Sequence, residues 1–247
     1  MIQPYTPDVS LAGKLRRRFA RLTHRRPASI DLRRPVVSFT FDDIPASAAH
    51  AGAEALERHD ARGTFYVCAG LFGQEGHMGR FAAADEIGAL VRKGHEVAGH
   101  THNHVDCHRT SSNDLKADLD ANDDALRALG SPSLHFAYPY GEVSPRSKKQ
   151  LAARYASLRG VHKALVHDGD DRNQLPGVGI EGADGEAVAR AWIDRAVAER
   201  AWLILYTHDV REAPSPWGCT PAALDRLIIH ARAVGCDIRT VGEVLGA

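Results

Sequence analysis

Short apolar runs alternate with longer amphipathic segments along most of the chain. Short runs bounded by turn residues are typical of buried strands, and apolar positions three and four apart are typical of helices. The pattern predicts strands at residues 36–41, 63–68, 95–99, 134–138, 178–180, 201–206 and 236–241. It predicts helices at residues 46–58, 81–92, 112–129, 144–155, 185–199 and 221–233. At 247 residues, this alternation favours a single α/β barrel-like domain.

The sequence predicts a basic N-terminal arm at residues 1–34 and a barrel domain at residues 35–247. Within the arm Leu11, Leu15, Phe19 and Leu22 recur at helical spacing with arginines between them, which predicts a short basic amphipathic helix. The simpler interpretation is a solvated arm or a helix packed on the barrel. The alternative is peripheral contact with an anionic membrane, which would suit a substrate carried on lipid.

Composition narrows the class of protein. Apolar residues make up 44% and charged residues 25%, which is ordinary for a globular protein. Lys+Arg and Asp+Glu both number 31, so the zero net charge argues against general nucleic-acid binding. No pair of the four cysteines forms a C-x-x-C motif, and no export signal or long apolar run is apparent. We therefore expect a cytoplasmic protein, and the arm would suit the inner face of the membrane.

Reactive side chains follow the ends of several predicted strands. These residues are Asp42, Asp43, His100, His104, Tyr140 and His208. In a parallel barrel all such ends open on one face, where active sites lie. We therefore expect these side chains to meet at one mouth.

Their residue types suggest a metal centre. Residues four apart on one helical turn face the same way, so His100 and His104 are able to bind one ion. An Asp-Asp pair is more often a turn or a helix cap, and a lone histidine is more often structural. If Asp43 is the third ligand, Asp42 is free to act as a base and His208 as the acid that protonates a leaving nitrogen.

Four motifs in this order resemble the polysaccharide deacetylases of carbohydrate esterase family 4, the NodB-homology domain. Three match fully and the fourth in part, and together they span most of the chain beyond the arm: residues 40–43 (TFDD), 100–104 (HTHNH), 205–209 (LYTHD) and 136–141 (FAYPYG).

The resemblance implies a distorted (β/α) barrel of seven or eight strands. It implies a divalent ion, most commonly zinc, on Asp43, His100 and His104, with Asp42 as general base and His208 as general acid. The main-chain N–H of Tyr140 would help to hold the oxyanion. The implied reaction removes an N-acetyl group from an amino-sugar glycan or its precursor and releases acetate.

The chain also departs from the family pattern. An arginine that orients the base is often found where this chain has Ala137, and we expect Arg159 to replace it. The usual Asp-Trp element is not apparent; Asp168, Asp170 and Asp171 could stand in for its aspartate, but the match is too loose to transfer the role. Tyr206 occupies an acetate-pocket position where leucine is usual. These changes indicate a divergent branch.

Two other functions compete with deacetylation. One is an amidohydrolase that acts on a non-sugar amide, which the low aromatic content of 6% weakly favours because sugar clefts often use stacking aromatic rings. Tyr138, Tyr140, Trp217 and Phe72 are the candidates for such a stacking platform. The other is a carbohydrate-binding module that holds a metal without turnover, an idea suggested by Ala137.

Overall fold

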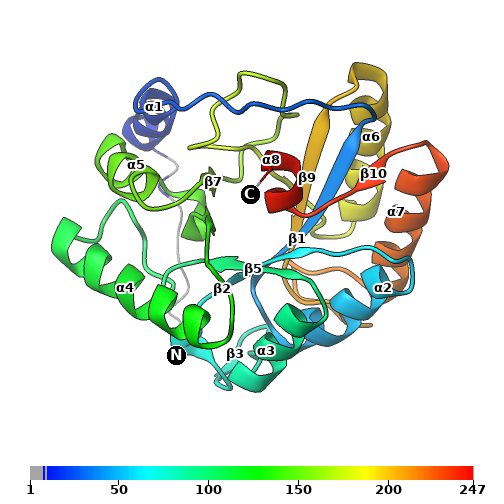
Figure 1. Cartoon of the computed structure of the whole chain (residues 1–247), viewed down its shortest axis with the longest axis horizontal. Coiled ribbons are helices and arrows are strands. Elements are labelled where there is room, and N and C mark those ends of the chain that lie inside the picture. Colours follow the sequence, from blue (N-terminus) through cyan, green and yellow to red (C-terminus); the bar gives the residue numbers. More distant parts are fainter. Residues whose placement is uncertain (1–7, 9, 247) are drawn as a thin grey trace.

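The computed structural model describes residue 8 and residues 10–246, and it consists of a curled parallel sheet with helices packed around it (Figure 1). The sheet has the strand order β7-β6-β5-β2-β1-β9-β8, with β10 also paired to β1. Its strands are β1 Val36–Asp43, β2 Thr64–Val67, β5 Glu96–Gly99, β6 His135–Ala137, β7 Ser157–Arg159, β8 Val178–Gly179, β9 Trp202–Thr207 and β10 Asp237–Ile238. The predicted α/β barrel of seven or eight strands is confirmed.

Most helices lie outside the sheet, as in a barrel of this kind, whereas the short C-terminal helix lies over the middle of the ring (Figure 1). They are α1 Leu11–Ala20, α2 Ala53–Glu57, α3 Ala84–Arg92, α4 Ser112–Ala128, α5 Pro145–Ala152, α6 Gly185–Glu199, α7 Pro221–Ala233 and α8 Val241–Leu245. A π-helical turn, η1 Ala48–Gly52, precedes α2, and the short 3-10 turns are η2 Ala69–Leu71 and η3 Pro139–Gly141. The division of the chain into an arm and a domain at residue 35 stays a prediction.

Some elements differ from the prediction. The predicted strand 236–241 is cut to Asp237–Ile238, because Thr240 caps a new helix, α8. The strand β7 and a two-stranded hairpin, β3 Glu75–Gly76 with β4 Gly79–Arg80, were not predicted. All three strands are two or three residues long, too short for a periodic signal.

An irregular segment closes the barrel between β7 and β8. Leu175 pairs with Arg159 of β7, and three residues later Val178 of β8 pairs with Leu205 of β9. The N–H of Gly160 donates to the carbonyl of Leu175 at 2.8 Å, and the N–H of Leu175 donates to that of Leu158 at 2.8 Å. This loop therefore takes the place of a regular strand, which is why the barrel is distorted.

Alternation along the central strands sets which side chains face inward. Val37, Phe39 and Phe41 of β1 pack in the outer core under the helices. Ser38 and Thr40 alternate with them on the other face, where the indole of Trp202 donates to Ser38 Oγ at 2.9 Å. Side chains along a strand point to opposite faces in turn, so Asp42 falls on the inner face with Ser38 and Thr40.

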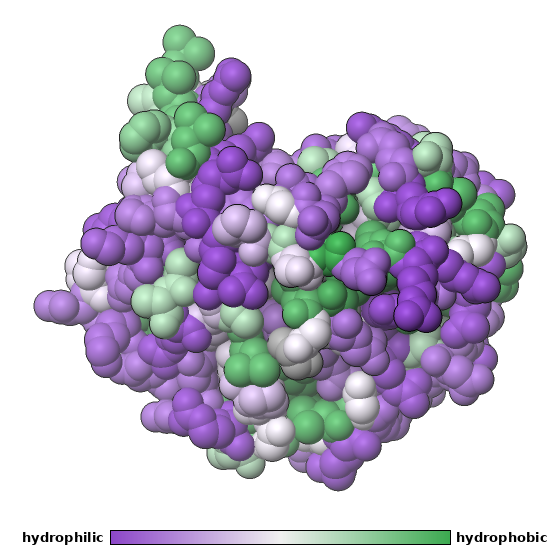
Figure 2. Space-filling model, turned by 45° about the horizontal axis from the view of Figure 1, so that its top comes forward, coloured by the Kyte–Doolittle hydropathy of each residue, from purple (hydrophilic) through white to green (hydrophobic). Residues whose placement is uncertain are grey.

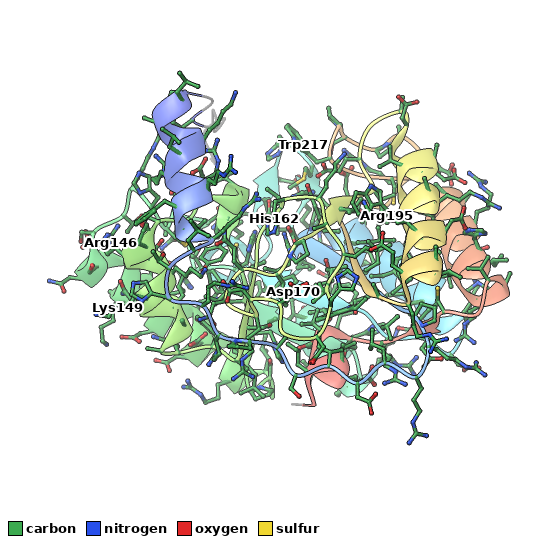
Figure 3. The ribbon with its side chains drawn as sticks, turned by 90° about the horizontal axis from the view of Figure 1, so that it is seen from above. Arg146, Lys149, His162, Asp170, Arg195 and Trp217 are labelled. Atoms are coloured by element: carbon green, nitrogen blue, oxygen red, sulfur yellow. The ribbon has the colours of Figure 1, made fainter. Side chains whose placement is uncertain are left out.

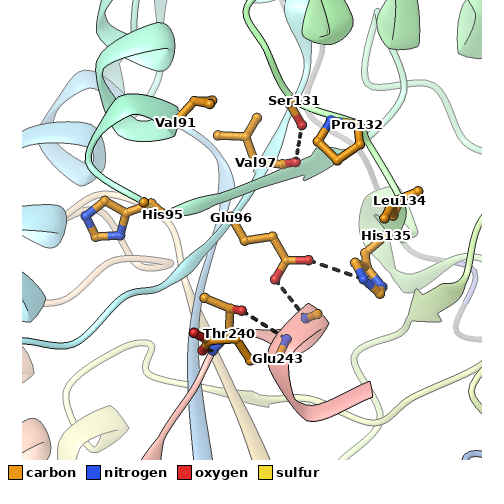
Figure 4. Close-up of a pocket in the computed structure, with 12 residues that line it drawn as sticks. Val91, His95, Glu96, Val97, Ser131, Pro132, Leu134, His135, Thr240 and Glu243 are labelled. Atoms are coloured by element: carbon orange, nitrogen blue, oxygen red, sulfur yellow. Dashed lines mark hydrogen bonds and ion pairs between the residues drawn. The ribbon is translucent and has the colours of Figure 1, made fainter. Parts of the chain in front are cut away.

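The end of the barrel opposite the strand C-termini is closed around Glu96 (Figure 4). Its carboxylate accepts from Thr64 Oγ1 at 2.6 Å and from the N–H of Gly242 at 3.1 Å, and it lies 3.4 Å from Nε2 of His135. A cavity of about 250 Å³ lies beside these residues. Glu96 thereby ties β5, β2, β6 and α8 together.

We expect Glu96→Ala to lower the free energy of unfolding by about 1–3 kcal/mol, since it leaves a buried hydroxyl and N–H without their acceptor. Chemical denaturation of the purified variant measures this. Glu54→Ala removes an exposed carboxylate on α2 and is expected to change stability by less than about 0.5 kcal/mol. Equal stability of both variants would contradict the structural role of Glu96.

Among the described residues, no helix combines the length and apolar character needed to cross a bilayer. All four cysteines are buried as free thiols. The cytoplasmic location stays a prediction.

Candidate active site

The sequence-predicted residues gather where the parallel strands end. Asp42 and Asp43 close β1, and His100 directly follows β5, while Tyr140 lies just beyond β6. His208 follows β9, whose Thr207 pairs with Phe41 of β1. The strands are parallel, so all of these ends open at the same mouth.

Asp43 lies between the two histidines. Its Oδ1 atom is 3.2 Å from Nε2 of His100 and 3.0 Å from Nε2 of His104. The three side chains are almost completely buried. The structure thus brings the predicted carboxylate and the two predicted imidazoles together.

The reason given for that grouping was wrong. Residues 100–104 form an irregular loop and no helical turn, and both Thr101 (φ 63°) and His104 (φ 52°) are left-handed. Asp43 (φ 62°) and Tyr140 (φ 60°) share this conformation, which costs about 1–3 kcal/mol at a residue other than glycine. Such strain persists only where the surrounding structure enforces it, and it is concentrated here at the residues that converge.

The Nδ1 atoms of the two imidazoles, which face away from Asp43, each have a hydrogen-bond partner. Nδ1 of His100 lies 2.8 Å from the carbonyl of Ala137, and Nδ1 of His104 lies 2.9 Å from the hydroxyl of Tyr140. A proton on each Nδ1 satisfies both contacts and leaves the lone pair of each Nε2 directed at Asp43. Metal-binding histidines are commonly held in this way.

The residues present fit a divalent ion. Oδ1 of Asp43 is buried and has no hydrogen-bond partner of normal geometry among the described residues. Burial alone raises the pKa of Asp43, but His104 and His100 in their charged form outweigh it and hold that pKa well below its usual range. The carboxylate is therefore ionised beside the two rings. A divalent ion would take the place of the proton on each Nε2, and one carboxylate oxygen with two imidazole nitrogens is a donor set that suits zinc.

Cys68 is a further donor near this cluster, since its Sγ, a carboxylate oxygen of Asp43 and a ring nitrogen of His100 lie within 4.8 Å of one another. Its thiol, however, donates to the carbonyl of His100 at 3.0 Å. Burial raises the pKa of Cys68 well above its usual range, so the sulfur stays protonated and is a poor ligand. His104 is the better third donor.

Asp42 is held by a buried arginine. Nη2 of Arg159 forms a close ion pair with Oδ1 of Asp42, and both side chains are buried. The guanidinium lies between two aromatic rings, 5.0 Å from the centroid of Tyr66 and 5.1 Å from that of Tyr206. Burial lowers the pKa of Arg159, but the charge of Asp42 more than offsets it and raises that pKa, so the guanidinium stays charged. The predicted contact between Arg159 and Asp42 is confirmed.

His208 has a carboxylate partner that the sequence analysis missed. Its Nδ1 lies 3.5 Å from Oε1 of Glu181 and 3.2 Å from the carbonyl of Trp217. The other oxygen of Glu181 is 3.5 Å from the hydroxyl of Tyr206. Glu181 comes two residues after the end of β8, so the rule that site residues follow strand ends would have found it.

Comparisons with known proteins give the family of the chain. A model of the polysaccharide deacetylase family matches residues 29–157, just over half of the chain. The chain belongs to the polysaccharide deacetylase family.

A chitin deacetylase of Arthroderma benhamiae is 27% identical over 213 residues, which are 85% of this chain and 52% of that protein. A probable peptidoglycan-N-acetylglucosamine deacetylase of the same fungus is 24% identical over 216 residues, 85% of this chain and 44% of that protein. The chain thus spans about half the length of these curated relatives. The solved structure of the chitin deacetylase from Colletotrichum lindemuthianum has a TM-score of 0.67 at 22% identity, covering 90% of this chain and 92% of that one.

The arginine that this family often has at the position of Ala137 is replaced here by Arg159, which lies on the adjacent strand. Ala137 of β6 and Arg159 of β7 are paired in the sheet, so they stand at the same level. Ala137 packs with Tyr66 and Ala98 inside the barrel, where its small side chain leaves room for the guanidinium. In this family member a guanidinium therefore reaches Asp42 from the neighbouring strand.

Two of the aspartates considered in place of the missing Asp-Trp element make contacts between loops. Asp168 accepts from the N–H of Ile30, and Asp171 pairs with the buried Lys148, so both hold loops together. Glu181 is the carboxylate beside His208. Of the stacking candidates, Tyr138 is only 1% exposed and is excluded, whereas Trp217 is 45% exposed.

Proposed function

We propose that the protein is a metal-dependent hydrolase that removes N-acetyl groups from an amino-sugar glycan or glycan precursor and releases acetate. One observation carries the proposal. Asp43, His100 and His104 converge through their ligand atoms, while the adjacent carboxylate Asp42 is kept apart from them by its own cation, Arg159. The family membership and the relatives named above support the same reaction.

A divalent ion held by Asp43, His100 and His104 would polarise the acetamide carbonyl and lower the pKa of water. Asp42 then takes the proton of the attacking water, and Arg159 keeps that carboxylate oriented. The main-chain N–H of Tyr140 donates to the developing oxyanion. His208 gives a proton to the leaving amine, with Glu181 orienting its ring.

Acetate release from N-acetylglucosamine oligomers, measured against release from simple amides, tests the substrate class. We expect activity on the oligomers, its loss after chelation, and its return with zinc. Preference for the simple amides would favour an amidohydrolase. Binding of the oligomers without acetate release at full metal occupancy would favour a carbohydrate-binding module.

Glu181→Gln is expected to lower kcat by about ten- to a hundredfold with little change in KM, because the ring of His208 loses its ionised partner. Burial raises the pKa of Glu181 above its ordinary value of 4.5, although the charge of His208 opposes this. As pH falls through that raised pKa the carboxyl group becomes neutral, so wild-type kcat should fall on the acid side of its pH profile, and the variant should lack this fall.

The pH–rate profiles of both proteins measure this effect. Glu186→Gln is the matched control, since that carboxylate pairs with Arg226 on the outer helices. Identical profiles for Glu181→Gln and wild type would remove Glu181 from the site.

A further inference from the structure

One face of α1 carries large apolar side chains that point into solvent. Leu11, Leu15 and Phe19 lie four residues apart on the helix, and Leu22 follows on the same side just beyond its end. Their exposed fractions are 78%, 67%, 58% and, for Leu22, 71%. Figure 2 shows them as a hydrophobic projection above a mainly hydrophilic surface. We call these four residues the apolar stripe.

The opposite face of α1 is fixed to the barrel. Arg16 and Arg17 both pair with the buried carboxylate of Glu142, at 2.6 and 2.8 Å. The ammonium group of the buried Lys148 donates to the carbonyl of Ala20 at 2.8 Å. An amphipathic helix on a globular protein normally packs its apolar face inward. Here the polar face is anchored and the apolar stripe is left outside, so its exposure is built into the fold.

The apolar stripe is accompanied by unpaired positive charge. Lys14, Arg18, Arg21 and Arg25 are exposed and form no salt bridge with another residue of the part that the structure describes. Helical geometry places Lys14 and Arg18 along one edge of the stripe. The surface therefore combines exposed hydrocarbon with several cations.

This surface lies at the mouth of the barrel. Glu142, which anchors α1, comes two residues after Tyr140 of the candidate site. In Figure 3 α1 projects from the body at the same end of the molecule as Trp217, which follows β9. A partner that covers the apolar stripe would therefore lie beside the entrance to the site.

We propose that α1 docks on the surface of a bilayer rich in anionic phospholipid, with the apolar stripe in the boundary between headgroups and acyl chains. Only such a surface offers hydrocarbon and dense negative charge together, which is what basic amphipathic helices bind. A second copy of the chain fits less well, because its own Lys14 and Arg18 would face those of the first. The proposal does not depend on the proposed catalytic function.

Co-sedimentation of the full chain with vesicles tests it. One set is phosphatidylcholine alone, and in the other about a third of the lipid is phosphatidylglycerol. We expect binding to the anionic vesicles only, with weaker binding in about 0.5 M salt than in about 0.1 M salt. Leu15→Ser/Phe19→Ser and Lys14→Glu/Arg18→Glu should each lower the partition coefficient by about tenfold or more.

Two matched controls should bind like wild type. Ile229→Ser removes an apolar side chain that is 49% exposed on α7. Arg33→Glu/Arg34→Glu makes the same charge change at exposed positions before β1, at the opposite end of the barrel. Thermal melts of all variants, together with acetate release from a soluble oligomer, check that the barrel is intact.

The proposal is overturned if wild type does not bind the anionic vesicles, or if the control variants lose binding as much as the α1 variants do. It is also overturned if wild type is a dimer in sedimentation equilibrium and Leu15→Ser/Phe19→Ser is a monomer, since the stripe would then be an interface between copies. If wild type binds the anionic vesicles but releases no acetate from the oligomer, only the catalytic proposal fails.

Discussion

Asp42→Asn is expected to lower acetate release by about a hundredfold or more while the purified variant keeps its full metal content. The asparagine has nearly the same shape, but it does not accept a proton from water. His100→Ala is expected to lose both activity and metal, because its Nε2 lies 3.2 Å from Oδ1 of Asp43 and would be one of three ligands. Metal analysis and acetate assays on both variants separate the two roles.

Asp60→Asn is the matched control for the base. It makes the same chemical change at an exposed position whose left-handed backbone (φ 48°) asparagine tolerates. If Asp42→Asn and His100→Ala retained metal equally, the division between base and ligands would be wrong.

Arg159→Ala is expected to have the largest effect on stability. It leaves the buried carboxylate of Asp42 without its cation, and breaking a buried pair from one side costs about 3–5 kcal/mol. It should also lower kcat, since the base loses its orientation. Urea denaturation and steady-state kinetics measure the two effects.

Two double variants sharpen this test. Arg159→Ala/Asp42→Asn removes both charges and should recover stability without activity. Arg159→Ala/Ala137→Arg returns the cation to the family's usual strand and should recover part of kcat, because the two positions are paired across the sheet. A kcat for Arg159→Ala within about threefold of wild type would show that the arginine does not orient the base.

The sequence predicted the fold well because its strands and helices carry clear periodic signals. It also predicted the meeting of Asp43, His100 and His104, since the ends of parallel strands share one face. It did so for a partly wrong reason, because nothing in the HTHNH motif reveals left-handed backbone at Thr101 and His104. Glu181 was missed although it directly follows the predicted strand at residues 178–180, because a single glutamate in an irregular segment belongs to no motif.

The orientation of α1 on the barrel could not be predicted from the sequence either. The spacing of Leu11, Leu15 and Phe19 predicts an amphipathic helix, but the simpler expectation is that such a face packs inward. The opposite outcome depends on Glu142, which lies 125 residues from Arg17 and carries no signal of this role. Long-range ion pairs of this kind are set by topology and not by local pattern.

The pairing of Ala137 with Arg159 bears on how inactive relatives are recognised. A search that scores each motif separately would count the alanine as a lost catalytic partner and class the chain as degenerate. The structure leads to a different conclusion, because the guanidinium of Arg159 on the adjacent strand occupies the space left by the small side chain of Ala137. Before a divergent homologue is classed as inactive, its adjoining strands should therefore be checked for a residue that supplies the missing charge.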